Sequence, residues 1–89
     1  MKHKAPFKVG MKLRYVGRHH YLNADGSDAL KSGMVGEVTE CRTGYEAHTH
    51  DFGDGPEHVP AMDDWSVVVM PSGFGRAVSH DSRNDWEKI

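Results

Sequence analysis

Histidine is the residue type in this sequence most suited to chemistry, with seven among 89 residues. His48 and His50 are two positions apart, so on a β-strand both imidazoles would project from the same face. His58 follows closely in the sequence, and imidazole is a common ligand of zinc and nickel. We expect either a small metal site built from His48, His50 and His58 or, alternatively, strand histidines that simply face solvent.

Motifs for catalysis are weaker than this histidine pattern. The sequence contains no HExxH motif and only one cysteine, Cys41. Asp63 and Asp64 are adjacent, so on a strand they would point to opposite faces and form a poor acid–base pair. Nothing near Cys41 would activate its thiolate, and we expect it to pack as a small apolar residue. The protein is therefore predicted not to be an enzyme and to need no cofactor.

Positive charge is concentrated near the N-terminus. Residues 1–20 carry six lysines and arginines and no acid, whereas residues 51–89 have a formal charge of −5. Guanidinium, imidazole and aromatic groups together can bind phosphates and stack on a base. The candidate nucleic-acid-binding residues are Lys8, Lys12, Arg14, Arg18, His19, His20 and Tyr21. The alternative is that the two halves of the chain pair their charges within the fold, and that the lysines protect a strand edge.

The acidic second half could present a surface for a basic protein. Phe74 lies between two glycines. It is expected either to anchor a partner at a loop tip or to fold back over the core. The candidate protein-binding residues are Asp51, Asp54, Glu57, Asp63, Asp64 and Phe74.

The chain length suits one domain, which we place at residues 7–89 after a flexible, basic N-terminus at residues 1–6. The single cysteine excludes an internal disulfide and favours a reducing cytoplasm. No apolar run has the length needed to cross a bilayer, and the first residues lack the apolar stretch of a secretion signal. We expect a cytoplasmic monomer with an unidentified protein or nucleic acid as its partner and no contact with a membrane.

Short strands separated by turns are the elements that would position these residues. Leu13 and Tyr15 alternate with charged residues, which is typical of a half-buried strand. Gly36 indicates a bulge or a close backbone approach inside the second strand. The expected elements are strands at 11–15, 34–41, 45–52, 65–70 and 76–80, a long loop at 18–28, a wide loop at 53–64, and a helical turn with a closing strand at 81–89.

These strands would enclose a small core. The run Trp65–Met70 is rich in β-branched residues and predicts an interior strand. Trp86 and Ile89 would plug one end of the barrel. The residues expected to fill its middle are Leu13, Val38, Val67, Val69 and Trp86.

Four segments carry a resemblance to a known group of folds: 9–15, 33–38, 65–69 and 85–89. In their glycines and strand spacing they resemble SH3-like barrels, and more narrowly the KOW-related and the small phage or prophage-type members. The resemblance implies an all-β fold, a small SH3-like barrel of about five strongly bent antiparallel strands with a short helical turn near the C-terminus. KOW relatives contact RNA, ribosomes or transcription machinery, and SH3 domains contact proline-rich peptides. A non-enzymatic binding or adaptor module is the function that the resemblance implies.

Overall fold

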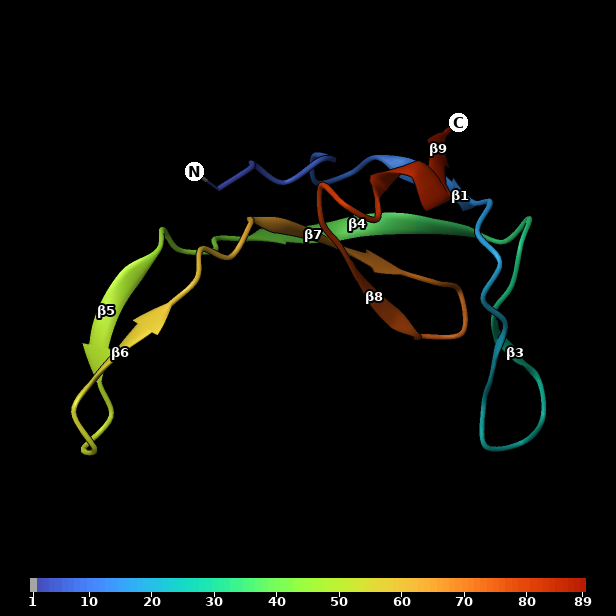
Figure 1. Ribbon diagram of the computed structural model, residues 1–89. Coiled ribbons are helices and arrows are strands. Elements are labelled where there is room, and N and C mark those ends of the chain that lie inside the picture. The colour runs from blue at the N-terminus through green and yellow to red at the C-terminus, as the bar shows by residue number, and fades with distance from the viewer. Residues whose placement is uncertain (1) are drawn as a thin grey trace.

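The computed structural model describes residues 2–89, and its regular structure is almost entirely β (Figure 1). Five antiparallel strands form one sheet in the order β8-β7-β4-β1-β9. Their bounds are Lys12–Tyr15 for β1, Val35–Arg42 for β4, Trp65–Val69 for β7, Gly75–Val78 for β8 and Trp86–Lys88 for β9. A single 3-10 turn, η1 (Arg83–Asp85), precedes β9. The predicted all-β fold with a late helical turn is thus confirmed, as a sheet curled into a half-barrel.

Strand β4 lies at the centre of the sheet and causes much of its curl. Its register against β7 shifts between Val38 and Glu40, and such a bulge bends a strand and increases its twist. Gly36 confirms the predicted close approach, because a Cβ there would lie 2.7 Å from the sulfur of Met70 and 2.7 Å from a methyl of Val68. A side chain at this position would therefore push β4 away from β7.

The core lies inside the curl. Leu13, Val38 and Trp86 are buried there, as predicted. Val67 and Val69 were expected in the core as well, and this prediction is wrong: Val68 is fully buried, whereas its two neighbours are half-buried on the outer face. An unbroken run of β-branched residues contains no polar residue that shows which alternate positions face inward. The other buried apolar residues are Phe7, Tyr15, Ala29, Leu30, Met70 and Val78.

Three further expectations about elements, and one about Ile89, need correction. The segment expected at 45–52 does not join the main sheet, because β5 (His48–Asp51) pairs only with β6 (Pro56–Val59). Strand β6 lies where a wide loop was predicted. The loop expected at 18–28 contains β2 (Tyr21–Leu22) and the start of β3 (Asp28–Leu30), which form a second hairpin. Ile89 is exposed and plugs nothing.

The N-terminal segment runs beside the start of β7. The hydroxyl of Ser66 donates to the carbonyl oxygen of Phe7 at 2.7 Å and accepts from the amide of Phe7 at 3.1 Å. His3 bonds through its backbone to both Asp63 and Asp64. The segment is therefore held to the domain by several hydrogen bonds. The flexibility predicted for residues 1–6 is a statement about motion and stays a prediction.

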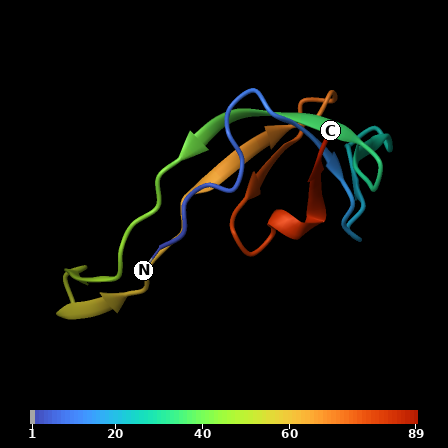
Figure 2. The same cartoon turned by 90° about the horizontal axis from the view of Figure 1, so that it is seen from above.

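The molecule is elongated, with extents of 46 × 28 × 21 Å. Its radius of gyration is 15.7 Å, whereas a compact chain of this length would have about 12 Å. The cause is visible in Figures 1 and 2: the β5–β6 hairpin projects away from the half-barrel, and the N-terminal segment passes beside its root. We call residues 45–62, which comprise this hairpin and its two connections to the sheet, the arm.

Candidate functional site

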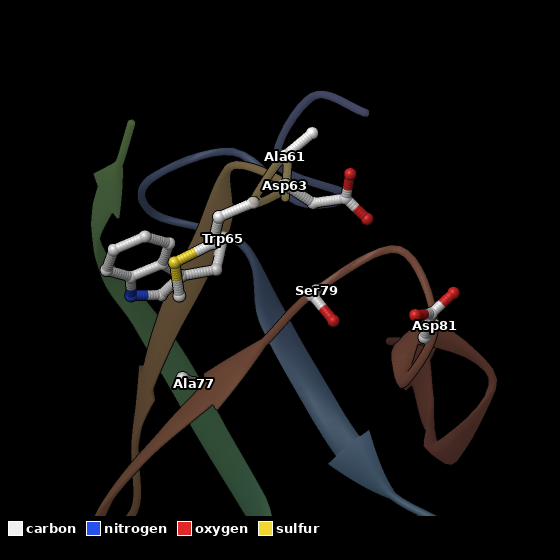
Figure 3. A pocket seen from close by; sticks show the side chains of 7 residues that line it. Ala61, Asp63, Trp65, Ala77, Ser79 and Asp81 are labelled. Atoms are coloured by element: carbon white, nitrogen blue, oxygen red, sulfur yellow. The ribbon is translucent and has the colours of Figure 1, made fainter. Parts of the chain in front are cut away.

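A hollow of about 540 Å³ opens on the outer surface where the arm meets the sheet (Figure 3). Strand alternation creates it: Ser66 faces the core, so Trp65 before it faces outward. In Figure 3 the indole of Trp65 lies at one end of the hollow and the carboxylate of Asp81 at the other, with Ser79 between them. We call this feature the Trp65 groove. Its lining residues are Ala61, Met62, Asp63, Trp65, Ala77, Ser79 and Asp81.

Two stretches of the chain, residues 61–65 and 77–81, build the groove, and the pairing of β7 with β8 brings them together. Strand β8 contributes Ala77, which pairs with Val67 and so shares the outer face of the sheet. The loop between β8 and η1 contributes Asp81, and the root of the arm contributes Met62. The result is a surface on which apolar side chains lie beside two carboxylates. Such a surface is suited to binding a chain segment that carries both apolar and cationic groups.

The two adjacent aspartates at the arm's root have different roles. Asp64 accepts hydrogen bonds from the ammonium of Lys2 at 3.0 Å and from the amide of Gly44 at 2.7 Å. The Lys2 bond first, and then the Gly44 amide, hold the pKa of Asp64 below its usual value of 3.8. Asp63 accepts from the backbone amide of His3 at 2.8 Å and lines the groove. Asp64 thus joins the N-terminal segment to the root of the arm, whereas the Asp63 side chain lines the groove, where it could contact a ligand.

The N-terminal segment also contacts the loop that carries Asp81. The imidazole rings of His3 and His80 are stacked, with centroids 3.8 Å apart and planes 8° apart. The guanidinium of Arg83 donates to the carbonyl oxygen of His80. The stack links the N-terminal segment, which is bonded to Asp63, to the loop that carries Asp81, and the Arg83 bond lies within that loop.

The candidate nucleic-acid-binding residues on β1 lie among acids. Lys12 is exposed and pairs across the sheet with Glu37 of β4. Arg14 forms an ion pair with Glu87 of β9, with 2.9 Å between nitrogen and oxygen. Lys8 is exposed beyond the end of the strand. The face of β1 therefore carries mixed charge, as in the alternative in which the two halves of the chain pair their charges.

The loop candidates after β1 are also partnered. His20 lies 2.5 Å from a carboxylate oxygen of Asp28, and Lys31 lies 3.0 Å from the other. The His20 bond first, and then the Lys31 bond, lower the pKa of Asp28. Arg18 and His19 are exposed, and the backbone amide of His19 donates to the hydroxyl of Tyr15. These residues do not form a continuous cationic surface.

Phe74 has folded back over the core, the second of its two expected positions. Its ring stacks on Tyr21, with centroids 5.8 Å apart, and it packs against the core cluster. The guanidinium of Arg76 lies 5.0 Å from the centre of the Tyr21 ring. Tyr21 and Phe74 thus stabilise one end of the half-barrel. Of the other candidate protein-binding residues, Asp51, Asp54 and Glu57 lie on the arm, and Asp63 and Asp64 lie at its root.

The structure does not bring the three candidate metal ligands together. His48 and His50 share a face of β5, but His58 pairs with Thr49 and therefore projects from the other face. Among residues 2–89 no group of three or more histidine, cysteine, aspartate or glutamate side chains could hold a metal ion. The expected His48, His50 and His58 cluster is corrected accordingly. Its geometry depends on the register of β5 against β6, which sequence spacing does not reveal.

Cys41 is also placed differently from the prediction. It is exposed rather than packed, and its thiol donates to the carbonyl oxygen of Phe7 at 3.2 Å. The hydroxyl of Ser66 lies 3.9 Å from the sulfur. Neither neighbour is a base that would generate a thiolate.

Comparisons with protein-family models, with curated proteins and with solved structures found no match. In the described part of the chain, no helix is long and apolar enough to cross a membrane.

Sequence reasoning missed most of the groove. Trp65 was recognised as a strand residue, and Asp63 as a candidate for protein binding. Met62, Ala77 and Asp81 were not singled out, because residues 77–81 reach residues 61–65 only when β8 pairs with β7. No local signal marked Trp65 as outward-facing, because the polar residue beside it, Ser66, is the one that faces the core.

Proposed function

We propose that this protein is a non-enzymatic binding module that holds a short segment of a protein partner in the Trp65 groove. The observation that carries the proposal is the groove itself, which a half-buried tryptophan and two carboxylates line together. Half-buried aromatic side chains offer large contact areas at a low cost in conformational entropy, and they dominate many interfaces. The resemblance to SH3-like, KOW-related and phage or prophage-type proteins belongs to the same proposal, as does a cytoplasmic location.

The chemistry of the groove favours a particular kind of peptide. Trp65, Met62 and Ala77 favour an apolar side chain, and Asp63 and Asp81 favour a lysine or arginine near it. A nucleic acid is a poorer occupant, because its phosphates would approach these carboxylates. Acids of the neighbouring strands β4 and β9 weaken the other candidate surface for nucleic acid, on β1, in the same way.

The proposal can be tested with a library of random peptides about twelve residues long, selected against the immobilised protein. Enriched peptides are expected to combine a lysine or arginine with an apolar residue. When such a peptide is titrated into isotope-labelled protein, the indole N–H signal of Trp65 should shift. Trp86 is buried in the core and provides the internal control, because its indole signal should stay in place.

Two variants sharpen this test. Trp65→Ala should weaken peptide binding by at least about tenfold, since an aromatic anchor commonly contributes that much. Asp81→Asn should weaken it less, and chiefly at low salt. Leu22→Ala is the matched control, because Leu22 is exposed on the β2–β3 hairpin. Peptides that bind Trp65→Ala as well as the natural protein, or that shift only signals of β1, would contradict the proposal.

A further inference from the structure

Like the Trp65 groove, the arm is a feature that packing of the core does not require. All four residues of β5 are exposed, and in β6 only Val59 is even half-buried. A two-stranded hairpin alone in water is at best marginally stable. The arm therefore exposes two strand edges and adds little burial to the half-barrel.

The root of the arm is nevertheless rigidly specified. Tyr45 and Met62 exchange backbone hydrogen bonds of 2.9 and 2.8 Å. Gly44 packs so closely against the backbone of Met62 and Asp63 that a Cβ there would overlap their carbonyl oxygens. The arm is thus held in one direction relative to the sheet.

The tip of the arm presents one large apolar side chain. Phe52 is 63% exposed, and its ring meets that of His50 edge to face with centroids 4.4 Å apart. The turn is preorganised, because Gly53 and Gly55 have φ values of 107° and 105° and Asp51 accepts a hydrogen bond from the amide of Gly53 at 2.7 Å. A preordered aromatic at a tip is the kind of residue that anchors an interface.

The charge of the arm indicates what it would meet. Four acids, Glu46, Asp51, Asp54 and Glu57, lie between residues 45 and 62, and no lysine or arginine does. This charge repels nucleic acids and anionic membranes. It also disfavours the Trp65 groove of a second copy, whose rim includes Asp63 and Asp81. We propose that the arm docks on a basic protein surface, where an apolar pocket surrounded by lysines or arginines receives Phe52.

This proposal can be tested with a photo-crosslinking amino acid at position 52 of the intact protein, in the cells that produce it. The same amino acid at position 22, which is 61% exposed on the other hairpin, is the control. We expect a protein adduct at position 52 that position 22 does not form, joined to the partner at a patch rich in lysine and arginine. No such adduct, or adducts only with nucleic acid or with a second copy of this chain, would overturn the proposal.

Binding to the purified partner then gives the decisive comparison. Phe52→Ala should weaken the affinity by at least about tenfold. The triple variant Asp51→Asn, Asp54→Asn and Glu57→Gln should remove most of the salt dependence of the affinity, while the amide oxygen introduced at position 51 can still accept the bond that shapes the turn. Leu22→Ala on the β2–β3 hairpin should leave this affinity unchanged. A partner that binds Phe52→Ala as tightly as the natural protein, with both melting alike, would show that the arm does not dock.

Discussion

At the scale of single residues, glycines and aspartates at the root of the arm decide its direction. Gly44 lies where β4 has ended and the arm begins, and it leaves no room for a side chain against the backbone of Met62 and Asp63. Asp64 joins the same root to the N-terminal segment through its bonds to Lys2 and Gly44. Neither role is visible in the sequence, where Gly44 resembles an ordinary turn glycine.

Gly44→Ala is expected to lower the free energy of unfolding by about 2 kcal/mol, since overpacking against backbone atoms cannot be relieved by a rotamer change. Gly75→Ala is the matched control, because a Cβ at Gly75 would meet nothing within 4 Å. Urea unfolding of both variants measures the difference. Equal stabilities would show that the root of the arm adjusts without strain.

Asp64→Asn should change how stability depends on pH. The folded protein holds the pKa of Asp64 below 3.8, so its contribution is complete above that value and is lost as the pH falls through the lower folded pKa. The variant should therefore have a lower free energy of unfolding than the natural protein at about pH 6, and this difference in free energy should become smaller toward about pH 2.5. Urea unfolding across this range measures it, with Asp54→Asn at the exposed tip as the control. A stability difference that does not change with pH would contradict the lowered pKa of Asp64.

At the scale of elements, the sequence indicated which segments form strands but not always which side of a strand faces inward. Leu13 and Tyr15 were correctly placed, because charged residues separate them and mark the outer face of β1. Strand β7 has no such marker after Ser66, and the buried residue among its three valines is Val68. For the same reason the sequence did not show that His58 projects from the opposite face of its hairpin to His48 and His50.

Matched valine-to-alanine changes in β7 should show this alternation. Val68→Ala is expected to lower the free energy of unfolding by about 2 kcal/mol, because it leaves a cavity in the core. Val69→Ala should cost less than about 1 kcal/mol, because Val69 is half-buried on the outer face. Urea unfolding of the two single variants provides the comparison. A larger effect at Val69 would mean that β7 is turned the other way.

At the scale of the whole molecule, the half-barrel and the arm are physically separate parts. The core residues come from the five-stranded sheet, the turn after β7, the β2–β3 hairpin and the segment before β1, and none comes from the arm. The chain could therefore lose the arm without losing core packing. The elongated shape reflects this division.

Replacing residues 46–61 by Asn-Gly tests this division. Tyr45 and Met62 already exchange both backbone hydrogen bonds, which is the pairing that a two-residue type I′ turn closes. The shortened protein should keep its fold, and its radius of gyration should fall from 15.7 Å toward about 11 Å. Small-angle scattering measures the radius, and the amide spectrum of the sheet measures the fold. Unfolding of the shortened protein would show that the arm supports the half-barrel.

The sequence alone determined the all-β class, most strand positions, the close approach at Gly36 and the late helical turn. These features depend on local properties: side-chain alternation, β-branching, turn residues and the steric freedom of glycine. The tertiary structure decided the register between strands, and with it the facing of Val68, the separation of His58 from the other histidines, and the convergence of the arm's root, β7 and β8 on the Trp65 groove. Strand facing and register depend on contacts made only when the strands pair and pack on the core, so side-chain alternation within a single strand could not have revealed them.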